Sequence, residues 1–166
     1  MFIINVVGFN FVWFGLVYWG NVFAPIAIAL LGAHIFYVSD KHNHEITLIF
    51  IVAVIGVVVD STLQSLGVFS FFGNAYLPIW LIILWFCFGA TLNHSLCFLK
   101  NSKILQVLVG AIIAPLSYLA GHQLNAVDFG LSVLTTYLVL SVIWAVLMVS
   151  LFYIKSLLDK SEVSYG

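Results

Sequence analysis

The five lysines constrain the fold of this chain more than any other feature, because they occur only in alternate gaps between its apolar segments. Short cytoplasmic loops of membrane proteins are enriched in Lys and Arg. If each apolar segment crosses a bilayer, every second connection lies on the same side of it. One charge bias therefore predicts six spans with both termini in the cytoplasm. The chain contains no arginine, and its lysines are Lys41, Lys100, Lys103, Lys155 and Lys160.

The composition requires a membrane around these segments. Hydrophobic residues make up 64% of the 166 residues and charged residues only 7%, whereas soluble domains contain about 25% charged residues. We expect an all-α, six-helix transmembrane bundle over residues 1–156 and a cytoplasmic tail over 157–166. Six spans of about 20 residues leave no room for a water-soluble catalytic domain. The expected spans are about 2–19, 22–38, 46–66, 79–98, 104–120 and 131–154.

Several functional classes are excluded by what the spans and loops lack. The lysines are scattered over three connections, so there is no basic stripe that could bind nucleic acid. No lysine lies inside a span, which excludes a retinal-type Schiff base, and the chain has no G-x-S-x-G nucleophile motif. We expect no bound cofactor.

Asp60 is the most informative residue inside a predicted span. An unpaired carboxylate at membrane depth costs about 2.5–3.5 kcal/mol on insertion scales, so Asp60 must face protein or water. Gly56, Asp60 and Gln64 recur at four-residue steps and therefore share one helical face. Two interpretations remain open. Asp60 is either a proton relay, ion ligand or head-group contact, or a structural carboxylate that holds helices together through hydrogen bonds.

Polar residues also gather at the outer end of the fifth span, after Pro115. This proline breaks the hydrogen-bond ladder of its helix and predicts a kink. Tyr118 and His122 follow it at helical spacing and reach the height of Asp60 in the membrane. An outer cavity is one hypothesis. Its binding or proton-relay residues would be Asp60, Gln64, Trp80, Trp85, Tyr118 and His122.

A plainer interpretation of the fifth span is that its small residues are packing positions and its polar residues belong to a hydrated loop. Gly110, Ala114 and Gly121 would then let neighbouring helices approach closely. Interfacial polar residues are common in membrane proteins. We favour this interpretation of the fifth span, while keeping the cavity hypothesis for Asp60.

The histidines on the cytoplasmic side suggest a metal only weakly. His42 and His44 flank Asn43, with Glu45 adjacent, while His34 and His94 should lie near the same face. A flexible H-x-H loop lacks the fixed geometry of a metal centre, and the helical H-E-x-x-H signature is absent. We therefore expect no metal, with His42 and His44 as weak candidates.

Three stretches resemble an uncharacterised bacterial inner-membrane family, a multi-span domain of unknown function of about 160 residues. They are GVVVDSTLQSLGVFSF, PIWLIILWFCFGATLNHSLCFL and GAIIAPLSYLAGHQLNAV. The resemblance implies a Gram-negative cytoplasmic membrane and relatives encoded beside lipid-modifying enzymes, but no activity. Ala114 departs from it, since a glycine is expected before the proline. The matching residues are Asp60, Pro78, Trp80, Leu84, Trp85, Pro115, Tyr118 and Gly121.

The leading functional hypothesis is a non-catalytic module of the inner membrane that binds or moves a lipid or small amphiphile through an outer-side cavity. One alternative is a partner or subunit of a membrane-lipid modification or stress-response system, associating with another membrane protein or with itself. A second alternative is an intramembrane lipid-modifying enzyme. That enzyme would need an acid and a base, which only Asp60 and His122 could supply.

Overall fold

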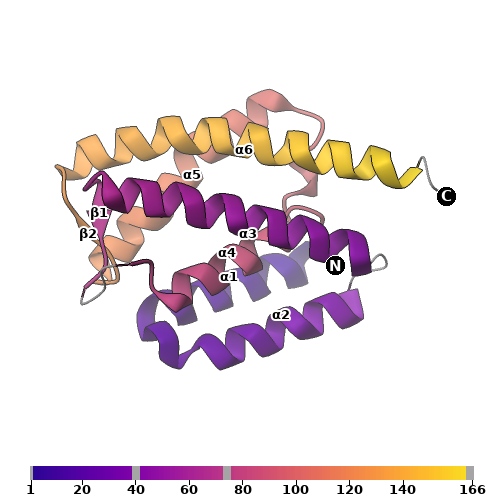
Figure 1. Cartoon of the computed structure of the whole chain (residues 1–166), viewed down its shortest axis with the longest axis horizontal. Coiled ribbons are helices and arrows are strands. Elements are labelled where there is room, and N and C mark those ends of the chain that lie inside the picture. The colour runs from indigo at the N-terminus through magenta and orange to yellow at the C-terminus, as the bar shows by residue number, and fades with distance from the viewer. Residues whose placement is uncertain (1, 39–41, 73–75, 164–166) are drawn as a thin grey trace.

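The computed structural model describes residues 2–38, 42–72 and 76–163, and of residues 42 and 161–163 it describes the backbone alone. The described residues are almost entirely helical (Figure 1). The helices are α1 (Phe2–Trp19), α2 (Ala24–Val38), α3 (His42–Ser65), α4 (Ile79–Gly89), α5 (Lys103–Gln123) and α6 (Val133–Val163). The described residues also form two short strands, β1 (Phe69–Ser70) and β2 (Asp128–Phe129). Two 3-10 helices connect other elements, η1 (Gly20–Val22) and η2 (Cys97–Leu99).

Four of these helices are long and apolar enough to cross a membrane. The shorter apolar helices α2 and α4 contain 15 and 11 residues, which gives lengths of roughly 22 Å and 17 Å against a hydrocarbon core of about 30 Å. Length and composition therefore identify a multi-pass membrane protein. The four long segments are Phe2–Val22, Asn43–Ser65, Lys103–Gln123 and Val133–Lys160.

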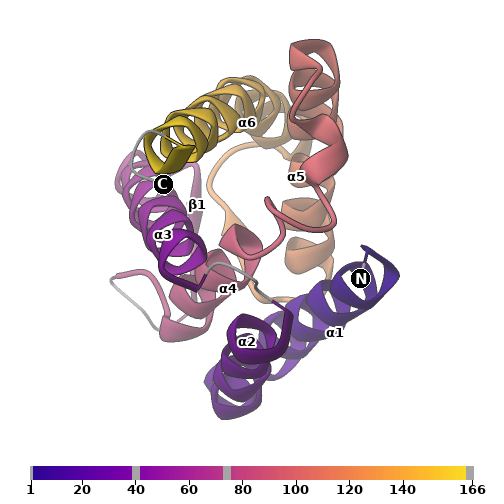
Figure 2. The ribbon, with the colours of Figure 1, turned by 90° about the vertical axis from the view of Figure 1, so that its right-hand side faces the viewer.

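The helices form two groups, α1–α4 and α5–α6, which meet where α3 contacts α6 and where β1 pairs with β2. Helix α4 packs against α1, α2 and α3, and α5 packs extensively against α6; Figure 2 shows α1 and α2 together on the side of α4 away from α6. Close α5–α6 packing depends on Gly110, because a Cβ atom there would overlap the main-chain carbonyl oxygen of Trp144. Helix α5 continues through Pro115, which is fully buried, without ending there.

The chain expected to form a span over 79–98 is α-helical only as far as Gly89. Beyond α4 the backbone tightens, with the N–H groups of Thr91 and Leu92 donating to carbonyl oxygens three residues earlier. The Thr91 hydroxyl also donates to the Phe88 carbonyl oxygen at 2.6 Å. This short polar side chain competes with the helical ladder and favours the turn.

Segment 90–102, which is not α-helical and contains η2, is supported by side chains from two other helices. Asn5 of α1 accepts a hydrogen bond from the Ser95 backbone N–H, and Gln106 of α5 donates to the Leu99 carbonyl oxygen at 2.9 Å. Irregular backbone at membrane depth is tolerated only where protein or a hydrated cavity surrounds it. The first part of the segment is accordingly buried at residues 90–92, whereas Cys97 and Phe98 are exposed.

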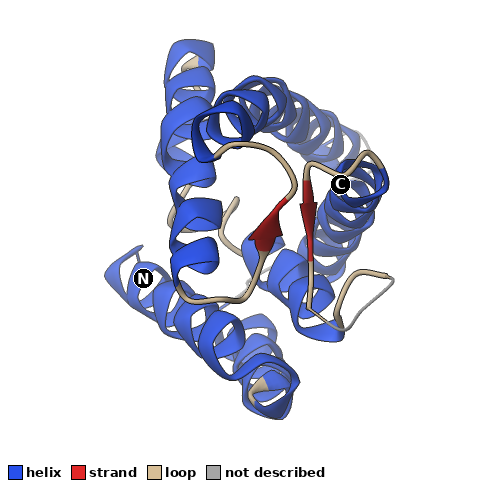
Figure 3. Ribbon diagram, turned by 90° about the vertical axis from the view of Figure 1, so that its left-hand side faces the viewer, coloured by secondary structure: helices blue, strands red, loops and turns tan. Residues whose placement is uncertain are grey.

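The two loops at the opposite end of the bundle from both chain termini pair with each other (Figures 1 and 3). Strands β1 and β2 are antiparallel, with Phe69 opposite Phe129 and Ser70 opposite Asp128. The Gly130 N–H donates to the Val68 carbonyl oxygen at 3.0 Å. These loops thus tie the α3–α4 hairpin to the α5–α6 hairpin.

Candidate functional site

Asp60 lies at the centre of a hydrogen-bonded group drawn from three helices. Its side chain is completely buried. Trp85 of α4 donates its indole N–H to one carboxylate oxygen at 2.7 Å, and the Tyr118 hydroxyl of α5 donates to the other at 2.8 Å. Both oxygens of Asp60 thus accept hydrogen bonds, and the carboxylate links α3, α4 and α5.

Gly56 makes this arrangement possible. It lies one turn before Asp60 on α3, and a Cβ atom at this position would overlap the Trp85 indole ring. The other face of Trp85 is stacked on Trp144 of α6, with ring centroids 5.2 Å apart and planes 8° from parallel. Trp85 is consequently fixed between α3 and α6, and its orientation places its N–H on Asp60.

A cavity of about 360 Å³ lies beside this group, between α1 on one side and α5 and α6 on the other, with α4 at its back. Trp85 and Tyr118 form part of its wall, while Asp60 lies behind them. The cavity extends from Phe71 and Val127 near the strands towards Phe2 and Phe98, which contact each other edge to face.

The cavity lining is apolar with a few uncharged polar groups. Among the described residues, no Asp, Glu, Lys, Arg or His side chain lines it. The polar side chains in its wall, apart from the Tyr118 hydroxyl and the Trp indoles, are Asn10, Thr91, Ser95 and Ser117. The Ser117 hydroxyl is already engaged, donating to the Ala114 carbonyl oxygen at 2.6 Å. The cavity is chemically suited to a mostly hydrocarbon ligand.

Of the remaining residues predicted from the sequence, Trp80 lines the cavity, whereas Gln64 and His122 do not. Trp80 lines the cavity, and its backbone N–H donates to the Asn21 side chain at 3.0 Å. Gln64 lies one turn beyond Asp60 on α3, outside the cavity lining. His122 lies at the strand end of the bundle, where its ring stacks on Phe129 and its Nδ1 is 3.0 Å from the Val127 carbonyl oxygen.

Two of these positions bear on an enzymatic mechanism. Asp60 and His122 have separate partners, so the contacts seen do not join them as an acid–base pair. A completely buried carboxylate that already accepts two hydrogen bonds is suited to holding Trp85 and Tyr118 in place. The geometry favours the structural interpretation of Asp60 over a solvent-linked proton relay.

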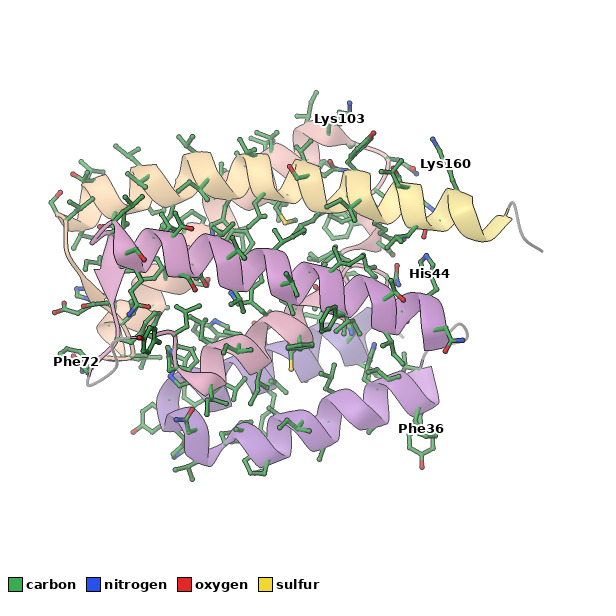
Figure 4. All side chains as sticks on the ribbon, viewed as in Figure 1. Phe36, His44, Phe72, Lys103 and Lys160 are labelled. Carbon is green, nitrogen blue, oxygen red and sulfur yellow. The ribbon has the colours of Figure 1, made fainter. Side chains whose placement is uncertain are left out.

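His44 lies at the end of the bundle that carries both termini (Figure 4), and it belongs to one of two separate groups of histidines. His44 Nε2 is 3.2 Å from one oxygen of Asp159, whose other oxygen accepts a hydrogen bond from Lys155 at 2.9 Å. The side chain of His42 lies outside the described part of the chain.

The second histidine group is a cluster of His34 from α2, Glu45 from the first turn of α3 and His94 from the segment after α4. Sequence reasoning placed His34 and His94 near the face that carries His42, His44 and Glu45, but it named only His42 and His44 as weak metal candidates. A further signal was the run T-L-N-H, which brings polar residues into an otherwise apolar segment. Such a run can mark a break in a helix that faces protein.

Comparison with known proteins gives one family match. A family model described as "Protein of unknown function (DUF2878)" matches residues 2–150. Neither a curated protein nor a solved structure matches the chain.

Proposed function

Because the chain belongs to the DUF2878 family of proteins of unknown function, we propose its role from its own geometry: it binds a membrane lipid or similar amphiphile in the cavity beside α1. The observation that carries this proposal is an uncharged, apolar cavity extending along a bundle of membrane-spanning helices. Its volume falls within the roughly 300–1,000 Å³ of ligand pockets. A hydrocarbon chain can fill such a cavity without burying an unpaired charge, because neither the chain nor the lining is charged.

The polar residues then have supporting roles. Tyr118 and Trp85 present amphipathic rings to the ligand, and Asp60 holds both rings from behind. Fixing these side chains before the ligand arrives lowers the entropy lost on binding. We therefore assign Trp80, Trp85 and Tyr118 to the cavity wall, and Asp60 to positioning. We place Gln64 and His122 outside the ligand contact.

The binding proposal is tested by native mass spectrometry of the protein purified in mild detergent. Wild-type protein is expected to carry a co-purifying lipid. Ala114→Phe should lower the occupancy at least about tenfold, because Ala114 lines the cavity and a phenyl ring would fill it. The matched control is Leu116→Phe. Leu116 lies on the same helix, but its side chain is 47% exposed on the surface of the bundle and does not line the cavity.

Two results would overturn the binding proposal. One is a wild-type protein that carries no lipid, either as purified or after incubation with phospholipid. The other is an Ala114→Phe variant that remains monodisperse and keeps the wild-type occupancy.

We further propose six membrane crossings in a bacterial inner membrane, with both termini cytoplasmic. Lys103, Lys160 and His44 lie towards the end of the bundle that carries both termini, whereas Phe72 lies at the opposite end (Figure 4). This separation agrees with the enrichment of Lys in cytoplasmic loops. In this arrangement α2 is a short span, and the fourth crossing consists of α4 continued by segment 90–102.

Reporter fusions in a Gram-negative host test this topology. Fusions after Asn43 and Ser102 are expected to report a cytoplasmic location, and fusions after Asn74 and Asn125 a periplasmic one. The fusion after Ser102 is the most informative, because α4 alone is too short to cross the membrane. A periplasmic signal there would contradict the six-crossing arrangement.

A further inference from the structure

The cluster of His34, Glu45 and His94, here called the His–Glu–His cluster, brings together three groups that ligate metals. His34 Nε2 is 3.1 Å and His94 Nε2 is 2.8 Å from the same oxygen of Glu45. The two imidazole rings meet edge to face, with centroids 4.6 Å apart and planes at 89°. Each residue comes from a different element, so the cluster exists only in the folded bundle.

The spacing of the ligand atoms fits a small tetrahedral ion. One ligand atom from each residue lies within 4.8 Å of the other two. Metal–ligand bonds of about 2.0–2.2 Å place tetrahedral ligand atoms roughly 3.3–3.5 Å apart. To reach this spacing the His34–Glu45 distance of 3.1 Å would lengthen by about 0.2–0.4 Å and the His94–Glu45 distance of 2.8 Å by about 0.5–0.7 Å, while the two imidazole nitrogens already lie within 4.8 Å of each other. Such a change lies within side-chain adjustment, without movement of a helix.

The chemistry of the three groups selects the class of ion. Two imidazole nitrogens and one carboxylate oxygen suit first-row transition metals, whereas Ca²⁺ and Mg²⁺ prefer all-oxygen sites. Three protein ligands also leave a fourth position free, as in catalytic zinc sites. We propose that the His–Glu–His cluster binds one divalent transition-metal ion of the Zn²⁺ type.

The surroundings of the cluster hold the ligands in place. Glu45 is buried, with 4% of its surface exposed. His34 lies within α2, Glu45 lies in the first turn of α3, and Ser95, the neighbour of His94, is held by Asn5 of α1. Ligands placed on helices and on hydrogen-bonded backbone cost less to gather, which is the main requirement of a metal site built on a scaffold.

The cluster is also accessible. The side chains of His34 and His94 retain 14% and 15% exposure. His34 additionally lines a second cavity of about 310 Å³, bounded mainly by α1 and α2, in which Cys87 is another lining residue. An ion can therefore reach the cluster without unfolding of the bundle.

Co²⁺ binding to the purified, chelator-treated protein tests this proposal. We expect wild-type protein to bind one Co²⁺ per chain, with a visible ligand-field band that Zn²⁺ removes by competition. We expect Zn²⁺ to raise the melting temperature of the wild type, because an ion that binds only the folded state stabilises it. Glu45→Gln and His94→Asn should each weaken binding at least about tenfold.

Two variants control for histidines outside the cluster. His122 lies at the other end of the bundle, so His122→Asn is one control. The double variant His42→Asn with His44→Asn is the other, because it removes the neighbouring histidines at the start of α3. Both should bind Co²⁺ like the wild type. Loss of binding in the double variant with retention in Glu45→Gln would assign the ion elsewhere and overturn the proposal. Monodisperse wild-type protein that binds neither Co²⁺ nor Zn²⁺ would show a purely hydrogen-bonded cluster.

Discussion

Replacing Asp60 with leucine is expected to remove most of the folded protein from the membrane, whereas replacing it with asparagine is expected to be tolerated. Leucine leaves the Trp85 indole N–H and the Tyr118 hydroxyl without their shared acceptor inside the bundle. Each unsatisfied buried donor costs about 1–3 kcal/mol, so the two together lower the free energy of unfolding by about 2–6 kcal/mol. Asparagine can still accept from the indole and can donate its amide hydrogens to the tyrosine oxygen.

Accumulation in the membrane and thermal stability in detergent measure this difference. Asp60→Leu should lower the melting temperature by at least about 5 °C, whereas Asp60→Asn should shift it by less than half as much. The matched control is Asp128→Leu, because Asp128 is an exposed aspartate. Unchanged stability for Asp60→Leu would contradict the positioning role. Normal stability for Asp60→Asn together with lost lipid binding would show that the carboxylate itself is needed.

Gly110→Leu is expected to separate α5 from α6. Any side chain at this position meets the main-chain carbonyl oxygen of Trp144, and beyond it the side chain of Met148. Main-chain atoms in a helix cannot move aside without moving the helix. Overpacking usually costs about 1–3 kcal/mol and occasionally more, and this is the most extensive helix pair in the bundle. We expect the variant to be aggregated or absent from the membrane.

Gly32→Leu is the matched control for this variant. Gly32 is also a helical glycine, but a Cβ atom there has no neighbouring atom within 4 Å. Size-exclusion chromatography in detergent distinguishes the two, with a monodisperse peak for Gly32→Leu and a void-volume peak or none for Gly110→Leu. Equal profiles would mean that α5 and α6 do not pack as closely as described.

Hydropathy and charge spacing in the sequence predicted the all-helical class and the membrane environment, and the resemblance of three stretches predicted the family. The first helix begins and ends where the apolar pattern predicts, at Phe2 and Trp19. The pattern did not reveal the end of α4 at Gly89, because the residues that follow remain largely apolar. A buried turn and a buried helix have the same composition when other parts of the protein satisfy their backbone. The helix that ends at Val163 likewise extends into the segment expected to be a tail.

The candidate site was predictable in part. Helical spacing placed Asp60 and Tyr118 at one height in the membrane, but height alone cannot say which helices are neighbours. The indole bond from Trp85 depends on the absence of a side chain at Gly56, a contact between two helices. The cluster of His34, Glu45 and His94 requires residues 49 positions apart to meet. Contacts between residues so far apart in the sequence depend on how the helices pack, and the local sequence pattern does not show this.

The pairing of β1 with β2 has a consequence for the order in which the protein is built. Strand β1 is synthesised before α4, but its partner β2 follows α5, so the ladder cannot form until α5 has been made. Until then β1 has no partner strand, and unpaired N–H and C=O groups at a strand edge are a site for incorrect pairing between chains. A ribosome that stalls within α5 would therefore hold an intermediate in which β1 is unpaired, and pairing becomes possible only after α5.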